Sequence, residues 1–289
     1  GIALMTTTRL AYSNDNFLLG QKFYDHVLEP QDALGRDQRF GDIFEQTKRE
    51  ITASVSGSVN HRNFSLLGDP SQRLAMPRGD VRITTITDTL GNPIDTLKAL
   101  STVRISGFVD NGSGQPLADF NGVVMPTVYD KEQLQLTLVN DPTPQSTPFQ
   151  FNIRKNVIYR GKATVTNGTF NFTFVVPKDI NYQIGPGRVS CYAESWSYNA
   201  SGFTNDPMVG GTATDVALDE KGPKIDLYLN DDQFVRGGLT DESPMLYAKL
   251  FDENGINTVG NSIGHDLVAT LDVNTEQAVV LNDLYEADL

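Results

Sequence analysis

The chain has 289 residues, a length that fits two or three domains, each able to bury its own core. Asp and Glu total 36 against 23 Lys and Arg, so the formal net charge is −13, and no basic run could neutralise phosphates. We therefore expect no nucleic-acid partner. No stretch approaches the roughly 18 consecutive apolar residues of a membrane helix, so no membrane-spanning segment is expected and the chain is predicted to be soluble.

Residues 1–78 are predicted to be α/β. Residues 2–8 form a short apolar and β-branched run suited to a buried strand. A helix is expected to begin near Asn14 and to end before Pro30, and a second helix to begin at Asp42. A strand of this kind normally has parallel neighbours on both sides, so we expect a truncated α/β layer whose remaining strands lie upstream.

Beyond residue 78 the helical period disappears, and short runs with a two-residue period follow. In the clearest of them, Asn167 and Gly168 suit a tight hairpin turn, and the phenylalanines that follow alternate on one face, which predicts core positions for Phe170, Phe172 and Phe174. Residues 103–109 and 134–139 alternate in the same way, as in a sandwich that buries one face of each sheet. The pattern predicts an immunoglobulin-like β-sandwich over residues 79–219.

A polar, turn-rich stretch at residues 219–223 marks a further boundary. Short alternating runs follow it at 224–229, 246–251 and 267–271. So few strands predict a second β domain over residues 220–289 that is small or truncated.

Two segments of the first part carry a resemblance. Residues 5–13 (MTTTRLAYS), followed by residues 63–74 (NFSLLGDPSQRL), resemble the closing portion of gingipain-family cysteine peptidase domains. The later chain is similar to the region that follows the peptidase domain in the PorU-type branch of that family, through motifs at 156–161, 174–180, 222–225, 252–257 and 264–266. The resemblance implies a multidomain chain in which a truncated, caspase/gingipain-like (Rossmann-like) α/β segment precedes immunoglobulin-like β-sandwich domains.

The resemblance also implies a function. Proteins of this branch are surface components of the type IX secretion system of Bacteroidetes, at the extracellular face of the outer membrane. They act as sortases that remove the C-terminal signal of secreted cargo and join the cargo to surface lipopolysaccharide. The implied partners are cargo proteins and other secretion components. In the family a Cys thiolate attacks the carbonyl and a His moves the proton, and both precede the matching region. We therefore expect no catalytic residue, cofactor or metal in this chain.

Cys191 is the one thiol that could contradict this expectation, with His26, His61 and His265 as candidate bases. Residues 189–193 have the pattern of a sandwich strand, which indicates a buried small hydrophobe rather than a nucleophile. His26 lies near a predicted helix C-terminus, where a surface histidine is ordinary. His265 follows the peptidase motifs and is interpreted as structural.

Residues 252–257 (DENGIN) offer clustered oxygens beside a glycine, which makes them a candidate calcium site. The acidic ligand that ends a calcium loop is missing from its place, and a turn is the favoured interpretation.

The resemblance yields one candidate site. In gingipains the loop after the strand that matches residues 2–8 carries a Trp that lines the specificity pocket, and Tyr12 falls at about that position. The resemblance therefore makes Arg9 and Tyr12 substrate-cleft candidates, and the departure from Trp leaves the identity of the pocket open. An ordinary pair of loop residues is the alternative.

Three functions stay open at this point. The first is an inactive C-terminal fragment of a type IX secretion sortase. The second is a secreted gingipain-type endopeptidase, which would carry a sorting domain after a single sandwich. The third is a non-catalytic docking module that holds proteins or glycans at the cell surface. The truncated α/β segment would also expose apolar surface that self-association could cover.

Overall fold

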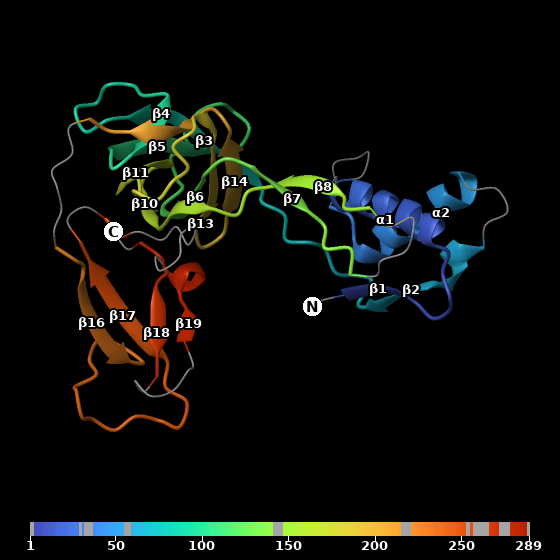
Figure 1. Cartoon of the computed structure of the whole chain (residues 1–289). Helices are drawn as coiled ribbons and strands as arrows, with labels where there is room; N and C mark the ends of the chain where they lie inside the picture. Colours follow the sequence, from blue (N-terminus) through green and yellow to red (C-terminus); the bar gives the residue numbers. More distant parts are fainter. Residues whose placement is uncertain are drawn as a thin grey trace. The chain divides into compact units, whose positions relative to one another are not determined.

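The computed structural model describes residues 3–28, 31, 37–54, 59–140, 147–214, 221–252, 255–256, 266–271 and 278–287. The chain divides into two compact units, Gly1–Met76 and Pro77–Leu289 (Figure 1). Both α-helices of the described residues lie in the first unit, and the second is built from strands. Within the described residues, no helix is long and apolar enough to cross a membrane.

The first unit places two helices on one face of a small sheet. It contains β1 (Ala3–Thr7), α1 (Ser13–Leu28), α2 (Phe40–Ser54), the short 3-10 helix η1 (Asn60–Asn63) and β2 (Phe64–Gly68). Its core joins Leu19 of α1, Ile51 of α2 and Phe64 of β2. The two predicted helices are confirmed to within a few residues, and the first begins at Ser13.

The pairing of β1 differs from the prediction. Its neighbour among the described residues is β2, which runs antiparallel to it, with Leu4 opposite Leu67. Residues 64–68 were interpreted only as part of a motif, because five residues that end in a Gly-Asp-Pro turn carry too little alternation to indicate a strand. Met5 packs against the helices. Leu4 and Leu67 are 58% and 55% exposed on the opposite face, so no layer formed by the described residues of this unit covers that face of the sheet.

The second unit is dominated by one large sheet. Seven of its strands follow the order β10-β6-β13-β14-β3-β5-β11, and β9 pairs with β6 beside them. These strands are β3 (Gly79–Thr87), β5 (Thr102–Asp110), β6 (Gly122–Tyr129), β9 (Val157–Arg160), β10 (Ala163–Val165), β11 (Thr169–Val175), β13 (Arg188–Glu194) and β14 (Asn199–Thr204). A three-stranded sheet joins β12 (Gly185–Pro186), β15 (Met208–Thr212) and β4 (Thr96–Ala99), and both sheets contribute to one apolar core.

The predicted turn at Asn167 and Gly168 is confirmed. Both residues have positive φ, 50° and 75°, which is the geometry of a two-residue hairpin. Thr166 and Thr169 exchange two main-chain hydrogen bonds across the turn, of 2.9 and 3.0 Å. Beyond this bridge the strands part, since β10 pairs with β6 and β11 pairs with β5. The turn therefore links the two ends of the large sheet.

The aromatic core prediction is also confirmed. Phe170, Phe172 and Phe174 are all buried. Tyr159 of β9 stacks on Phe172 and Phe174, with ring centroids 5.4 and 4.5 Å apart. Burial of three such rings on one side of β11 contributes several kcal/mol of hydrophobic stabilisation, at about 25 cal/mol per Å².

The predicted burial of residues 134–139 is wrong. β7 (Gln133–Leu136) pairs with β8 (Gln150–Ile153) in a separate two-stranded sheet. Leu134, Leu136 and Leu138 are all exposed. Alternation alone predicts a strand with one apolar face, but burial requires a second layer, and β7 pairs with no strand other than β8 in the described parts.

The remaining strands form two further pairs. β16 (Lys224–Leu229) pairs with β17 (Leu246–Phe251), and β18 (Val268–Thr270) pairs with β19 (Ala278–Val280), which is followed by η2 (Asn282–Leu284). The end of the chain returns to the large sheet, because Ala287 bridges Gly161 and Arg160 donates to the Asp283 carbonyl at 3.0 Å. The proposed boundary between residues 219 and 220 stays a prediction, as does the immunoglobulin type of the sandwich.

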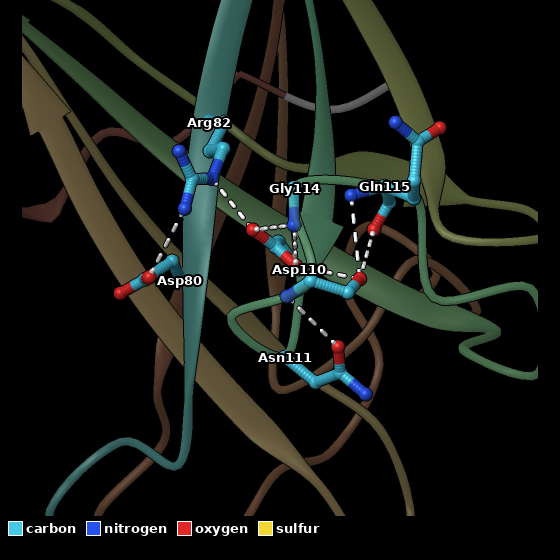
Figure 2. Close-up of polar contacts among 7 residues, drawn as sticks. Asp80, Arg82, Asp110, Asn111, Gly114 and Gln115 are labelled. Atoms are coloured by element: carbon cyan, nitrogen blue, oxygen red, sulfur yellow. Dashed lines mark hydrogen bonds and ion pairs between the residues drawn. The ribbon is translucent and has the colours of Figure 1, made fainter.

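A buried carboxylate fixes the loop that follows β5 (Figure 2). Asp110 is fully buried. It accepts hydrogen bonds from Arg82 Nε at 2.6 Å, from the Gly114 amide at 3.0 and 3.1 Å, and from Ser113 Oγ at 3.2 Å. Burial acts to raise the pKa of Asp110, but these donors outweigh it and hold the pKa below its ordinary value.

This balance predicts how the stability depends on pH. Replacing Asp110 by Asn lowers the free energy of unfolding at pH 7, because the charge-assisted hydrogen bonds are lost. The unfolded carboxyl titrates near pH 4 and the folded one lower. The wild type therefore exceeds Asp110→Asn in free energy of unfolding by the full amount above about pH 5. This difference disappears as the pH falls through the pKa of the folded Asp110. Urea unfolding at pH 7 and at acid pH measures it.

The exposed Asp119, in the same connection between β5 and β6, gives a matched control, and Asp119→Asn should change the stability little at either pH. An equal difference between wild type and Asp110→Asn at both pH values would contradict the prediction.

Candidate functional site

The candidate site is the loop of residues 8–12, which leaves β1 and enters α1. At its start Thr7 Oγ1 donates to the Arg9 carbonyl at 2.7 Å and accepts from the Arg9 amide at 3.3 Å. At its end the Asn16 amide donates to the Tyr12 carbonyl at 2.9 Å, which begins the hydrogen bonding of α1. Both ends of the loop are therefore fixed by local hydrogen bonds, from a side chain at the start and within the main chain at the end.

A second segment holds the middle of this loop. The Tyr12 amide donates to Asn60 Oδ1 at 2.9 Å, and the Thr8 amide donates to the Asn63 carbonyl at 3.1 Å. Asn63 Nδ2 makes a longer contact, 3.4 Å, to the Leu10 carbonyl. Asn60 is buried although it is polar. Sequence reasoning missed its role, because nothing in one sequence shows that an asparagine 48 residues after Tyr12 contacts it.

The two predicted cleft residues lie on this loop with their side chains in solvent. Arg9 is exposed, Leu10 is 97% exposed and Tyr12 is 75% exposed. A loop with a fixed main chain and exposed side chains can present a guanidinium and an aromatic ring to a ligand. The cleft role of Arg9 and Tyr12 remains a prediction.

His61 lies in η1, the short helix that also contains Asn60, and contacts α2. It is buried, and its Nε2 lies 3.0 Å from Thr52 Oγ1 of α2. Burial lowers the pKa of His61, and the nearby Arg62 and Lys48 cations lower it further. The imidazole is therefore neutral at pH 7 and suited to packing.

Cys191 lies on β13 inside the second unit and is 3% exposed. Burial raises the pKa of its thiol to about 12, so the thiol is protonated at neutral pH. These are properties of a structural cysteine, since a nucleophile needs an accessible thiolate.

His26, in the last turn of α1, lies 3.2 Å from Glu50 Oε1. His265 lies outside the described residues, as do residues 253, 254 and 257 of the segment 252–257. Among its described residues, the Gly255 amide donates to the Asp252 carbonyl at 3.2 Å. In the described ranges, no group of three or more His, Cys, Asp or Glu side chains could hold a metal.

The loop anchor can be tested directly. Asn60→Ala removes the acceptor of the Tyr12 amide and should lower the free energy of unfolding by about 1–3 kcal/mol, because a partly buried donor is left unsatisfied. Hydrogen exchange followed by mass spectrometry should show faster exchange in residues 8–16. Asn63→Ala is the matched control, since it removes only the 3.4 Å contact and keeps the main-chain bond to Thr8. Unchanged exchange in Asn60→Ala would contradict the anchor.

Comparisons with known proteins connect this site with a family. Residues 1–75, which include β1, both helices, η1, β2 and the candidate loop, match the family model described as Peptidase family C25. No curated protein matches the chain.

Two solved structures were also found to be similar. The crystal structure of dimeric latent PorU from Porphyromonas gingivalis is similar over 97% of this chain, at 29% identity and a TM-score of 0.47. The chain spans 26% of the length of that PorU chain. A β-glucosidase from Listeria innocua in complex with gluconolactone matches over 55% of this chain and 20% of its own, at 14% identity and a TM-score of 0.20. The match of residues 1–75 to the model of peptidase family C25, the gingipain family, confirms the resemblance seen in the sequence.

Proposed function

We propose that this chain is the C-terminal part of a gingipain-family cysteine peptidase that serves type IX secretion as a sortase. It would remove the C-terminal signals of cargo proteins and attach the cargo to lipopolysaccharide at the outer face of the outer membrane. The observation that carries the proposal is the match of residues 1–75 to peptidase family C25.

The buried state of the Cys191 thiol supports the proposal that the catalytic residues lie outside this chain. A cysteine peptidase needs a thiolate within reach of a base. The sequence contains one cysteine, Cys191, and its buried thiol has a pKa of about 12. The nucleophile of the parent enzyme would therefore come from a segment outside these residues. The chain itself would contribute the loop that carries Arg9 and Tyr12.

The exposed face of the small sheet supports the same conclusion. Leu4 and Leu67 lie opposite each other on the face that the helices leave open. Covering such a face stabilises a fold by about 25 cal/mol per Å² of apolar area. Further strands and helices of the same peptidase domain would cover it, and self-association is the alternative for the isolated chain.

The β region favours a sortase over a secreted endopeptidase. The large sheet is followed by two more strand pairs, from Lys224 to Val280, and by a tail that returns to Gly161. A secreted gingipain-type endopeptidase would instead carry a sorting domain after one sandwich. The alternative function is a docking module without catalytic activity.

The chain by itself should have no thiol peptidase activity. The physical reason is the buried, protonated state of Cys191. Fluorogenic peptides incubated with the 289-residue protein at pH 7.5, with and without iodoacetamide, should show the same background rate. Cleavage abolished by alkylation of Cys191 would overturn the assignment of catalysis to upstream residues.

The intact parent protein tests the function. Tyr12→Ala should slow removal of the C-terminal signal from a cargo protein at least about tenfold, because one aromatic contact to the substrate is lost. Tyr24→Ala is the matched control, since Tyr24 is similarly exposed but lies on α1, away from the loop. An unchanged rate in Tyr12→Ala removes the cleft role. If the intact parent protein removes no signal from the cargo protein, the docking module is the function that remains.

A further inference from the structure

The large sheet leaves a hollow on its outer side, at the seam where β10 and β11 part. The two strands share the bridge between Thr166 and Thr169 and then pair with different neighbours. The hollow has a volume of about 450 Å³. It is lined by Thr84, Ser106, Gly107, Phe108, Thr164, Thr166, Thr169, Phe170 and Asn171.

Strand register explains why short polar side chains gather there. On the outer face of the pair β5–β11, Asn171 lies opposite Ser106, and Thr169 lies opposite Phe108. Thr84 joins them from β3 at an irregularity between Ile83 and Thr85. Thr164 and Thr166 approach from the other side of the seam, so the rim of the hollow is formed by three different parts of the sheet.

A glycine packs the floor of the hollow closely against the core. A Cβ on Gly107 would lie 2.6 Å from Phe170 Cζ and 2.4 Å from the Arg82 carbonyl oxygen. Only glycine therefore lets β5 approach β3 and the buried Phe170 ring this closely. On the outer face, the half-buried Phe108 is the aromatic residue beside this glycine.

The lining has hydrogen-bonding capacity to spare. Thr84 and Thr169 donate to main-chain carbonyls, and Asn171 Oδ1 accepts from Arg104 Nη2 at 2.9 Å. Within the described residues the hydroxyls of Ser106, Thr164 and Thr166 make no hydrogen bond. They can each donate and accept, and Asn171 Nδ2 adds a further donor.

These properties select a class of ligand. No lining residue carries a formal charge, so the hollow offers neither a cation for a phosphate nor a carboxylate for a metal ion. A purely apolar ligand would desolvate the hydroxyls without pairing them. A neutral polyhydroxyl ligand pairs with the hydroxyls and lays its C–H face against Phe108. We propose that this hollow is a binding site for a neutral carbohydrate, of the size of one or two sugar rings.

The proposal is independent of the peptidase parentage and is tested on the 289-residue chain. The probes are methyl α-mannoside, methyl β-galactoside, N-acetylglucosamine and the neutral peptide Gly-Ser-Gly-Ser-Gly. Saturation-transfer NMR detects binding, and amide shifts of Ser106, Thr164 and Asn171 locate it. The variant Thr164→Val/Thr166→Val keeps the shape of both side chains and removes both free hydroxyls. Thr173→Val is the matched control, because Thr173 of β11 is exposed, like Thr164 and Thr166, but does not line the hollow.

At least one sugar should bind wild type and Thr173→Val alike, with amide shifts confined to the hollow. Its affinity for the double variant should be about tenfold lower, as expected for the loss of two neutral hydrogen bonds. Melting curves show whether the double variant folds, and if it does not, Ser106→Ala takes its place. The proposal is overturned if none of the sugars binds, if shifts lie elsewhere, if the folded variant binds as tightly as wild type, or if only the peptide binds.

Discussion

The two-residue turn at Asn167 and Gly168 is the constraint on which the β-rich unit depends. Positive φ at both positions allows the bridge between Thr166 and Thr169. Beyond the bridge, β10 and β11 lie at opposite ends of the strand order of the large sheet. Residues of β5, β6 and β11 consequently meet in one core, where the phenylalanines of β11 stack with Tyr159. Had β10 and β11 kept pairing, the result would be a plain hairpin, with neither the shared core nor the hollow outside it.

Buried aspartates fix the loops around this core. Asp110 ends β5, and its carboxylate accepts hydrogen bonds from the Gly114 amide and from Arg82 Nε (Figure 2). Asp130 directly follows β6, and Lys131 Nζ bonds to it at 2.6 Å while also reaching the carbonyls of Asn181 and Val209. A buried carboxylate is stable only when such donors surround it, so each aspartate imposes one loop geometry. The exposed β7–β8 hairpin starts from the second of these anchors.

The first unit combines a fixed loop with an incompletely covered sheet. Asn60 and the Asn63 carbonyl hold the main chain of residues 8–12, so Tyr12 is presented on a rigid support. The same unit leaves Leu4 and Leu67 uncovered on the far face of its sheet. This loop and this sheet lie within the residues that match the model of peptidase family C25.

The sequence by itself determined the two helices of the first unit, the turn at Asn167 and Gly168, the buried phenylalanines of β11 and the resemblance of residues 1–75 to the gingipain family, because each rests on local periodicity, turn chemistry or motif. The tertiary structure decided what depends on distant partners. It paired β1 with β2 in antiparallel fashion, exposed the leucines of β7 and brought Asn60 to Tyr12. Alternation predicts that a strand has an apolar face, but whether that face is buried depends on a second layer that only the folded chain supplies.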